Sequence, residues 1–455
     1  MNALRFHSTN GQAPPVNLRE ALFAGQAPDH GLYLPESFPR LSAAELATFP
    51  ELPYPDLAFR VLRPYTVGVL DEPVLAELCR DAYDFVVPLE PVHDRTHVLR
   101  LDRGPTASFK DFAARLMARL IGRFLREEGR PLTILTATSG DTGSAVAHAF
   151  HGLPGVQVIV LFPLTEVSVR QRKLMTTLTG NVRCLALDGK FDDCQALVKQ
   201  AFADPALKHL PLSSANSINI GRLLPQSVYY FYAASRLARP GEPIVFAVPS
   251  GNFGDMMGAV VARRMGLPVK RLVVPVNGND AFPRFLTTGV YEKIEPSRNC
   301  LSNAMNVGHP SNLARLVALY GGRMDERGQL HQSPDLEALR RDIFSTSVSD
   351  GQTLDTMRSA WQEHRLLLEP HGAVGWRGLL DYVATEPLDG APAVVLETAH
   401  PAKFPDDIER TLGFAPPVPP ALAAAEAAPE HYDRLPVDYA QFRRYLLETS
   451  NRDHP

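Results

Sequence analysis

The chain has few cysteines and no long hydrophobic run. Its four cysteines are scattered through 455 residues without CxxC spacing, so they give neither a zinc motif nor a disulfide framework. No apolar stretch approaches the length of a transmembrane helix, and the opening residues lack the cationic segment and apolar run of a signal peptide. These absences predict a cytoplasmic protein with free thiols, no metal site and no membrane partner.

The chain also lacks a strong charge of either sign. Lysine and arginine number 46 against 50 aspartate and glutamate residues, which gives a formal net charge of −4. Such a balance provides no overall basic field for nucleic acid or anionic membranes. No convincing Gly-Lys-Ser/Thr or Gly-x-Gly-x-x-Gly fingerprint follows a strand, which argues against a nucleotide-binding module. We therefore expect no nucleic-acid partner.

From residue 131 onward, short apolar runs alternate with amphipathic helical patterns. The runs LTILTATSG, VQVIVLFP and PIVFAVPSG predict buried strands, and the segments between them have helical spacing. This alternation indicates an α/β architecture with buried parallel sheets. Residues 1–87 are richer in loops and look like a separate N-terminal unit. Residues 415–430 form a Pro/Ala-rich connector to an amphipathic segment that we expect to dock on the body.

Lys110 follows a Gly-Pro-Thr turn and begins a helical pattern. Gly104 and Pro105 interrupt what precedes, and apolar residues then recur at helical spacing. A lysine in a first helical turn faces the positive end of the helix dipole, where a cation is mildly unfavourable. An arbitrary lysine in such a place is simply solvated. Any special role for Lys110 must therefore be supported by other parts of the chain.

Two junctions between a strand and a helix are suited to anions. In residues 248–264 a Gly-Asn-Phe-Gly loop precedes a helix that begins near Asp255, so backbone N–H groups and the helix N-terminus favour a phosphate. In residues 136–146 the N–H groups at a second helix start could hold a small carboxylate. Each junction could also be an ordinary tight turn or N-cap. Together they suit a ligand with two anionic ends.

Two further segments carry polar side chains beside predicted helices or strands. Asn216, Ser217 and Arg222 could form a phosphate site built from side chains, although a helix cap with a surface arginine is the simpler interpretation. Thr398 and His400 follow a buried strand. We interpret His400 as a packed, hydrogen-bonded histidine, because no second ligand lies at metal spacing.

Seven segments, taken in order, resemble the threonine synthase family. They are GPTASFKDFAAR, TATSGDTGSAVAHAF, NSINIGRLLPQSVYYF, VPSGNFGD, SNAMNVGHPSN, EPHGAVGW and TAHPAKF. The N-terminal STNGQAPPVNLREALFAGQAPDHGLYLPESFP is similar to the opening of the longer-chain branch, and the resemblance covers residues 5–412. It departs from many relatives at Arg103, where they have histidine, and from some at Asp255, where they have asparagine.

The resemblance implies a fold and a division into domains. The fold is pyridoxal-phosphate (PLP) fold type II, in which two open, twisted, mainly parallel sheets are flanked by helices, here with an additional N-terminal domain. The implied domains are 1–87 (N-terminal), 88–130 with 226–412 (large, PLP-binding), 131–225 (smaller, inserted, substrate-binding) and 413–455 (linker and C-terminal tail).

The resemblance also implies a site. Lys110 would form the Schiff base with PLP and would act as catalytic base and acid. The other implied cofactor-binding residues are Gly251, Asn252, Phe253, Gly254, Asp255 and Thr398. The implied substrate-binding residues are Ser139, Asp141, Thr142 and Gly143 for a carboxylate, and Asn216, Ser217 and Arg222 for a phosphate.

The implied reaction is the last step of threonine biosynthesis. O-Phosphohomoserine and water would give L-threonine and inorganic phosphate, with PLP as electron sink. Another PLP-dependent lyase, dehydratase or phospholyase of the same fold is the alternative, and a catalytically idle binding protein is a second. The oligomeric state stays open between monomer and homodimer.

Overall fold

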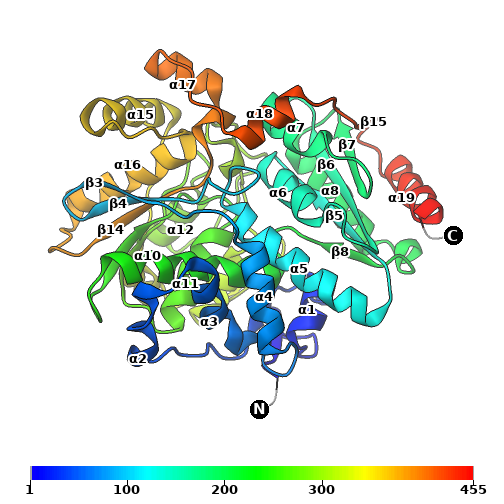
Figure 1. Cartoon of the computed structure of the whole chain (residues 1–455), viewed down its shortest axis with the longest axis horizontal. Helices are drawn as coiled ribbons and strands as arrows, with labels where there is room; N and C mark the ends of the chain where they lie inside the picture. Colours follow the sequence, from blue (N-terminus) through cyan, green and yellow to red (C-terminus); the bar gives the residue numbers. More distant parts are fainter. Residues whose placement is uncertain (1–2, 454–455) are drawn as a thin grey trace.

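The computed structural model describes residues 3–453, which are organised around two sheets (Figure 1). The larger sheet has the strand order β13-β10-β9-β14-β4-β3 and the smaller sheet the order β15-β7-β6-β5-β8. The β3–β4 pair is antiparallel, and the other strand pairs of these two sheets are parallel. The predicted α/β fold with two mainly parallel sheets is therefore confirmed. The strands are β3 (Leu89–His93), β4 (Thr96–Arg100), β9 (Ile244–Ala247), β10 (Val269–Val273), β13 (Ile343–Phe344) and β14 (Ala393–Glu397) in the larger sheet, and β5 (Leu132–Ala137), β6 (Val156–Pro163), β7 (Val182–Leu187), β8 (Leu212–Ser214) and β15 (Asp433–Leu435) in the smaller.

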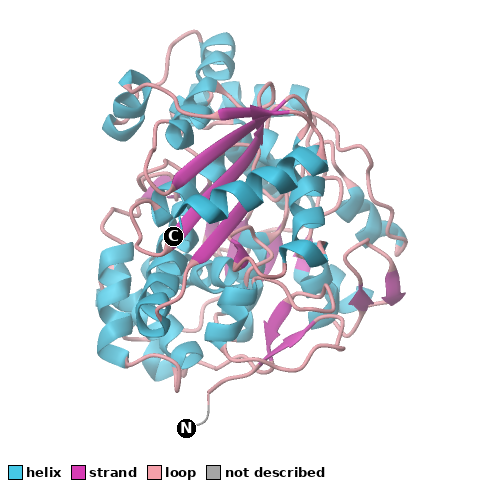
Figure 2. Ribbon diagram, turned by 90° about the vertical axis from the view of Figure 1, so that its right-hand side faces the viewer, coloured by secondary structure: helices cyan, strands magenta, loops and turns pink. Residues whose placement is uncertain are grey.

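The apolar runs of the sequence become the central strands of these sheets. Every residue of β5 and β6 is buried, and so is every residue of β9 and β14. Strands covered on both faces need continuous apolar sequence, which explains why these runs do not alternate with polar residues. Figure 2 shows helices on both sides of the strands. The helices that flank the two sheets are α5 (Lys110–Glu128), α6 (Asp141–Phe150), α7 (Val169–Thr176), α8 (Phe191–Ala203), α9 (Ile220–Leu223), α10 (Val228–Leu237), α11 (Gly254–Arg264), α12 (Ala281–Thr288), α13 (Leu313–Leu319), α14 (Leu336–Asp342), α15 (Asp350–His364), α16 (Pro370–Thr385) and α17 (Pro405–Leu412).

The N-terminal residues form the additional unit that the sequence predicts. A small antiparallel pair, β1 (Phe6–Ser8) with β2 (Tyr33–Pro35), has one helix between its strands and is followed by helices that pack on the rest of the protein. Here α3 contacts α10, and α4 contacts α5, the helix that begins at Lys110. The helices of this unit are α1 (Leu18–Ala24), α2 (Ala43–Leu46), α3 (Tyr54–Thr66) and α4 (Glu72–Ala82).

The C-terminal tail lies along the smaller sheet rather than apart from it. After α18 (Pro420–Ala427), β15 pairs in parallel with β7, and α19 (Tyr439–Asp453) packs on α8 (Figure 1, orange to red). Phe442 and Leu446 of α19 share an apolar cluster with Leu197 of α8. The amphipathic segment therefore docks on the body, and the tail supplies one strand of the smaller sheet. The domain boundaries given above stay a prediction.

No helix within the described residues is both long enough and apolar enough to cross a membrane.

The carboxyl ends of four strands position the segments that the sequence singles out. β4, β9 and β14 of the larger sheet lead to the loops at 101–109, 248–253 and 398–400, and β5 of the smaller sheet leads to 138–140. In parallel sheets such loops gather at one edge, where ligands bind.

Candidate active site

One cavity brings together almost all of the predicted site residues. It lies between the loops that follow the carboxyl ends of strands in the two sheets, and each predicted segment contributes to its wall. The predicted residues that line it are Lys110, Ser139, Asp141, Thr142, Asn216, Ser217, Arg222, Gly251, Asn252, Phe253, Gly254, Asp255 and Thr398.

Gly143 is the exception, because it does not line the cavity. Its N–H donates to Oγ1 of Thr138 over 2.8 Å, and a Cβ built on it would come within 2.5 Å of Cγ2 of the same threonine. Gly143 therefore allows close packing at the start of α6, and its N–H is already used within the protein. The N–H groups of Ser139, Asp141 and Thr142 have no acceptor among residues 3–453, so they are the donors that this helix start offers.

Lys110 is the first residue of α5, and the loop before it is held rigidly. The Asp111 carboxylate accepts hydrogen bonds from the N–H (2.9 Å) and the hydroxyl (2.6 Å) of Thr106. A Cβ at Gly104 would come within 2.4 Å of that carboxylate, so glycine is required at this position of the loop. The Phe109 N–H donates to the carbonyl of Thr398 over 2.9 Å. The loop thus fixes Lys110 against the end of β14.

The surroundings of Lys110 favour the loss of its proton. Burial lowers the pKa of Lys110; Asp141 acts in the opposite direction, and the nearby cations Lys403 and Arg222 add to the lowering. The Nζ atom lies 3.6 Å from Oδ2 of Asp141 and 4.8 Å from the centre of the Phe109 ring. A lysine in such a place can act as a nucleophilic amine, which an exposed lysine at neutral pH does poorly.

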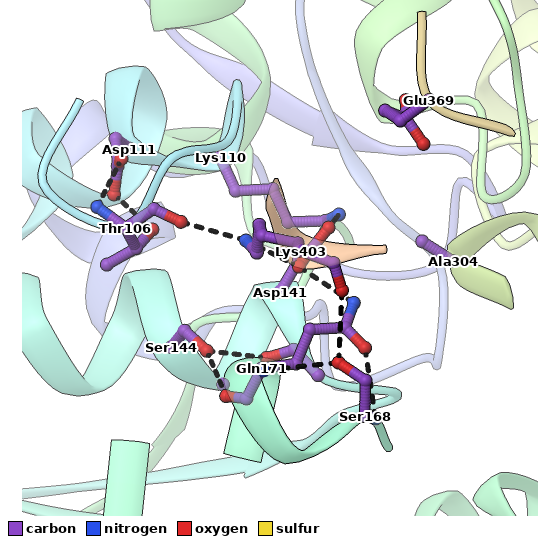
Figure 3. A network of polar contacts seen from close by, with 12 residues as sticks. Thr106, Lys110, Asp111, Asp141, Ser144, Ser168, Gln171, Ala304, Glu369 and Lys403 are labelled. Atoms are coloured by element: carbon purple, nitrogen blue, oxygen red, sulfur yellow. Dashed lines mark hydrogen bonds and ion pairs between the residues drawn. The ribbon is translucent and has the colours of Figure 1, made fainter. Parts of the chain in front are cut away.

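Asp141 is paired with cations rather than directed toward an empty space (Figure 3). Its Oδ1 lies 2.7 Å from Nζ of Lys403 and accepts a 3.0 Å hydrogen bond from Nε2 of Gln171. Burial would raise the pKa of Asp141, but the ammonium groups of Lys403 and Lys110 outweigh it and hold that pKa below its ordinary value. The residue is therefore a carboxylate whose charge is already compensated within the protein.

The loop at 251–254 provides a cradle for an anion. Phe253 adopts a left-handed conformation with φ of 63°, and α11 begins at the next residue. In the described chain none of the N–H groups of residues 251–255 donates to an acceptor. A Cβ at Gly251 would come within 2.9 Å of the carbonyl oxygen of Ala304 and of Cα of Met305, so only glycine fits there. Free N–H groups at a helix start are what a phosphate dianion requires.

Asp255 lies in the first turn of α11 and is fully buried at the cavity wall. Its Oδ1 accepts hydrogen bonds from the hydroxyls of Tyr229 (2.5 Å) and Tyr230 (2.6 Å). Its Oδ2 has no partner within residues 3–453. Burial raises the pKa of Asp255 to about 6, although the two tyrosines and Lys110 act in the opposite direction.

Arg222 and Asn216 line the same cavity, and each has a buried polar atom without a hydrogen-bond partner among the described residues. One terminal nitrogen of Arg222 donates to the carbonyl of Ala215 over 2.8 Å, whereas its Nε has no partner in the described part of the chain. Burial lowers the pKa of Arg222 to about 10, and Asp111 acts in the opposite direction, so the guanidinium remains a cation at neutral pH. Oδ1 of Asn216 likewise lacks a partner among the described residues. Unpaired buried groups of this kind indicate a polar ligand.

Comparison with known proteins gives the family. The model "Pyridoxal-phosphate dependent enzyme" matches residues 90–398, "Threonine synthase N terminus" residues 5–83, and "Threonine synthase, C-terminal" residues 372–446. The chain is 40% identical to the threonine synthase of Haemophilus influenzae, over 95% of this chain and 97% of that one. It is 38% identical to that of Escherichia coli, over 98% and 99%. The chain belongs to the threonine synthase family.

The solved structures of the threonine synthase family agree. The PLP-bound threonine synthase from Brucella melitensis superposes with a TM-score of 0.90 at 36% identity, covering 97% of this chain and 98% of that one. Threonine synthase from yeast gives 0.89 at 29% identity, with 99% of both chains covered. The cavity fits PLP, because it contains a buried lysine and a cradle of free N–H groups. Ala304 and Met305 close the space beside that cradle.

Neither His371 nor Lys403 is among the site residues that the sequence predicts. His371 lines the cavity; its Nδ1 donates to Glu369 over 2.5 Å, and its Nε2 accepts from the N–H of Ala304 over 3.1 Å. It therefore holds the segment that closes over Gly251. The segments EPHGAVGW and TAHPAKF, which carried part of the resemblance, were the available signal.

His400 is packed and hydrogen-bonded, as we expected. Its Nδ1 accepts from the N–H of Ala402 over 3.1 Å. Burial lowers the pKa of His400 to about 3, so it is neutral at physiological pH.

Proposed function

We propose that this chain is a threonine synthase that converts O-phosphohomoserine and water to L-threonine and inorganic phosphate. The observation that carries the proposal is the second cationic group in the cavity. Arg222 is buried, its Nε has no partner in the described part of the chain, and the residue lines the same cavity as Lys110 and the glycine cradle. A cofactor phosphate occupies one anion site, so the other is suited to a phosphate on the substrate.

The residues around Lys110 divide into two groups by what they would hold. The N–H groups of residues 251–255 would bind the cofactor phosphate, and Thr398 would face the ring nitrogen with a neutral hydroxyl. Bound PLP would supply an electron sink for carbon–hydrogen and carbon–oxygen cleavage. Ser139 and Thr142 would bind the substrate carboxylate, and Asn216, Ser217 and Arg222 its phosphate.

Lys110 would hold the cofactor in the resting enzyme and move protons during the reaction. Its amine loses a proton readily because burial lowers its pKa, so it can take the proton from the substrate α-carbon and return a proton further along the chain. The ring of Phe109, centred 4.8 Å from Nζ, would help to exclude water from the amine. Asp141 contributes its backbone N–H to the substrate carboxylate, whereas its own carboxylate is paired with Lys403.

The products distinguish this function from its main alternative. Wild type supplied with PLP and O-phosphohomoserine should release phosphate and threonine in equal amounts. Phosphate with 2-oxobutanoate would indicate an elimination lyase, and turnover of unphosphorylated serine alone would indicate a dehydratase. Either result would contradict the proposal.

We propose a small-molecule enzyme of the cytoplasm without a nucleic-acid partner. All four cysteines are free thiols, and Cys79, Cys184 and Cys194 are buried. Burial raises the pKa of each of these three thiols. This supports a reducing compartment. Fractionation of cells that express the tagged protein tests the location.

A further inference from the structure

Lys403 has no role in the function described so far, yet its ammonium group lies beside the reacting centre. It is the last residue of a short 3-10 helix, Pro401–Lys403, that follows β14 of the larger sheet. Its side chain is completely buried and does not line the cavity. Nζ donates to the carbonyl of Thr106 over 2.8 Å and lies 2.7 Å from Oδ1 of Asp141 (Figure 3).

These two contacts join three segments that must act together. Thr106 belongs to the loop that fixes Lys110, and Asp141 begins α6, which packs on the smaller sheet. Lys403 itself comes from the larger sheet. Loss of its ammonium would leave the buried carbonyl of Thr106 without this donor, and the buried carboxylate of Asp141 with only the Gln171 amide and the more distant Lys110. Loss of a buried ammonium of this kind is among the more costly changes that a protein interior can suffer.

Asp141 makes the compensation necessary. It lies in the helix start that offers its N–H groups to the substrate carboxylate, and an uncompensated carboxylate there would repel that anion. From the cavity side, Asp141 is 3.6 Å from Nζ of Lys110. If Lys403 were absent, Lys110 would become the nearest cation for Asp141.

We propose that Lys403 is a positioning residue that neutralises Asp141 and ties the loop of Lys110 to the substrate-binding helix start. The inference rests on the proposed function, since that function assigns a substrate carboxylate to this helix start. The charged and titratable groups that face Lys110 are Asp141, Lys403, Arg222 and Asp255, and His371 also faces Asp141.

The proposal predicts opposite effects for the two partners of the pair. In Lys403→Met, Asp141 is left to pair with Lys110, so Lys110 holds its proton more tightly. In Asp141→Asn, Lys403 and Lys110 are left as uncompensated neighbours, so Lys110 loses its proton more readily. In the double variant both charges are absent and the balance returns toward that of wild type.

The test is a pH titration of the visible absorption band of the holoenzyme, which reports the proton on the Lys110 nitrogen when that nitrogen is bonded to PLP, together with KM and kcat for O-phosphohomoserine. The charges of Asp141 and Lys403 act on that proton in the same direction as on the free amine. We expect Lys403→Met to move the midpoint upward by about one pH unit and to raise KM roughly tenfold or more. Asp141→Asn should move the midpoint downward, and the double variant should lie closer to wild type than Lys403→Met does. Lys270→Met is the matched control, because Nζ of Lys270 also contacts backbone carbonyls and a carboxylate (Asp389, 2.7 Å), far along the chain on β10.

Two results would overturn the proposal. One is a Lys403→Met holoenzyme with the midpoint and KM of Lys270→Met; the other is a double variant no closer to wild type than the single one. If Lys403→Met does not fold, an unchanged midpoint in Asp141→Asn has the same meaning. The absorbance titration needs no substrate, so it decides the role of Lys403 even if wild type forms no threonine, a result that would contradict the proposed function alone.

Discussion

Tyr230 donates a 2.6 Å hydrogen bond to Oδ1 of Asp255, the oxygen that also accepts from Tyr229, and the other carboxylate oxygen is left without a partner among the described residues. Asp255 directly follows the glycine cradle. A buried carboxylate with one unpaired oxygen at a phosphate site costs free energy when it is ionised. It also adds a negative charge where an anion is expected to bind.

Asp255 should therefore make the stability of the protein depend on pH. Burial raises its pKa to about 6 from an ordinary value of 3.8 in the unfolded chain. Between these values the folded protein binds more protons than the unfolded chain, so the free energy of unfolding falls as the pH rises. Asp255→Asn keeps an acceptor for both tyrosines and removes the charge. We expect the variant to be more stable than wild type at neutral pH, by about 3 kcal/mol.

Urea unfolding of wild type and Asp255→Asn at pH 4 and pH 8 measures this difference. The gain from the substitution should be present at pH 8 and nearly absent at pH 4. An equal gain at both values would mean that ionisation of Asp255 is not its cause.

Substitution of the two glycines in the cradle should have different effects on the affinity for PLP. A methyl group at Gly251 meets backbone atoms of Ala304 and Met305 at 2.9 Å, whereas the nearest atom to one at Gly254 is Cβ of Ser217 at 3.3 Å. Gly251→Ala must displace the backbone that closes the cradle, so we expect its affinity for PLP to fall roughly tenfold or more. Gly254→Ala, the control, should lose less. Titration of the apoenzyme with PLP, followed by absorbance, ranks the two, and a greater loss in Gly254→Ala would disprove this view of the cradle.

Two fully buried arginines should show contrasting effects. Arg222 lines the cavity, and its Nε has no partner among the described residues. Arg222→Met should therefore raise KM for O-phosphohomoserine roughly 30-fold, from the loss of about 2 kcal/mol of charge-assisted hydrogen bonding. Arg315 lies outside the cavity wall and donates to the carbonyls of Tyr33, Ser217 and Ile218. Arg315→Met should lower the free energy of unfolding. Arg222→Met should not, because the charge of Arg222 is poorly compensated when no ligand is bound.

Steady-state kinetics and urea unfolding of both variants provide the comparison. A substrate phosphate bound elsewhere would leave the KM of Arg222→Met near that of wild type.

The sequence predicts the fold and most of the cavity, because both depend on patterns that are local in the chain. Continuous apolar runs identify β5 and β6, and the loops that follow parallel strands must converge. The position of Gly143 outside the cavity wall could not be predicted from such patterns. Sequence cannot tell which N–H groups at a helix start are already used, and Thr138 takes the one at Gly143.

Contacts between distant segments could not be predicted in the same way. Lys403 meets Asp141 across 262 positions of sequence, and only the packing of the two sheets decides that they pair. The strand β15 is three residues long and forms only by pairing with β7. So short a strand has no periodicity by which it could be recognised in the sequence.

Two buried lysines lie close enough to the reacting centre to be candidates for the bond to the cofactor. Lys110 lines the cavity and has one long contact with a carboxylate, at 3.6 Å, whereas Nζ of Lys403 is held by two acceptors within 2.8 Å and lies outside the cavity wall. Borohydride reduction of the PLP-loaded enzyme, followed by proteolysis and mass spectrometry, locates the modified residue. We expect the pyridoxyl group on Lys110 and an unmodified Lys403. Two results would contradict this assignment. One is a pyridoxyl group on Lys403. The other is a pyridoxyl group on another residue of Lys110→Ala, formed in the same yield as in wild type.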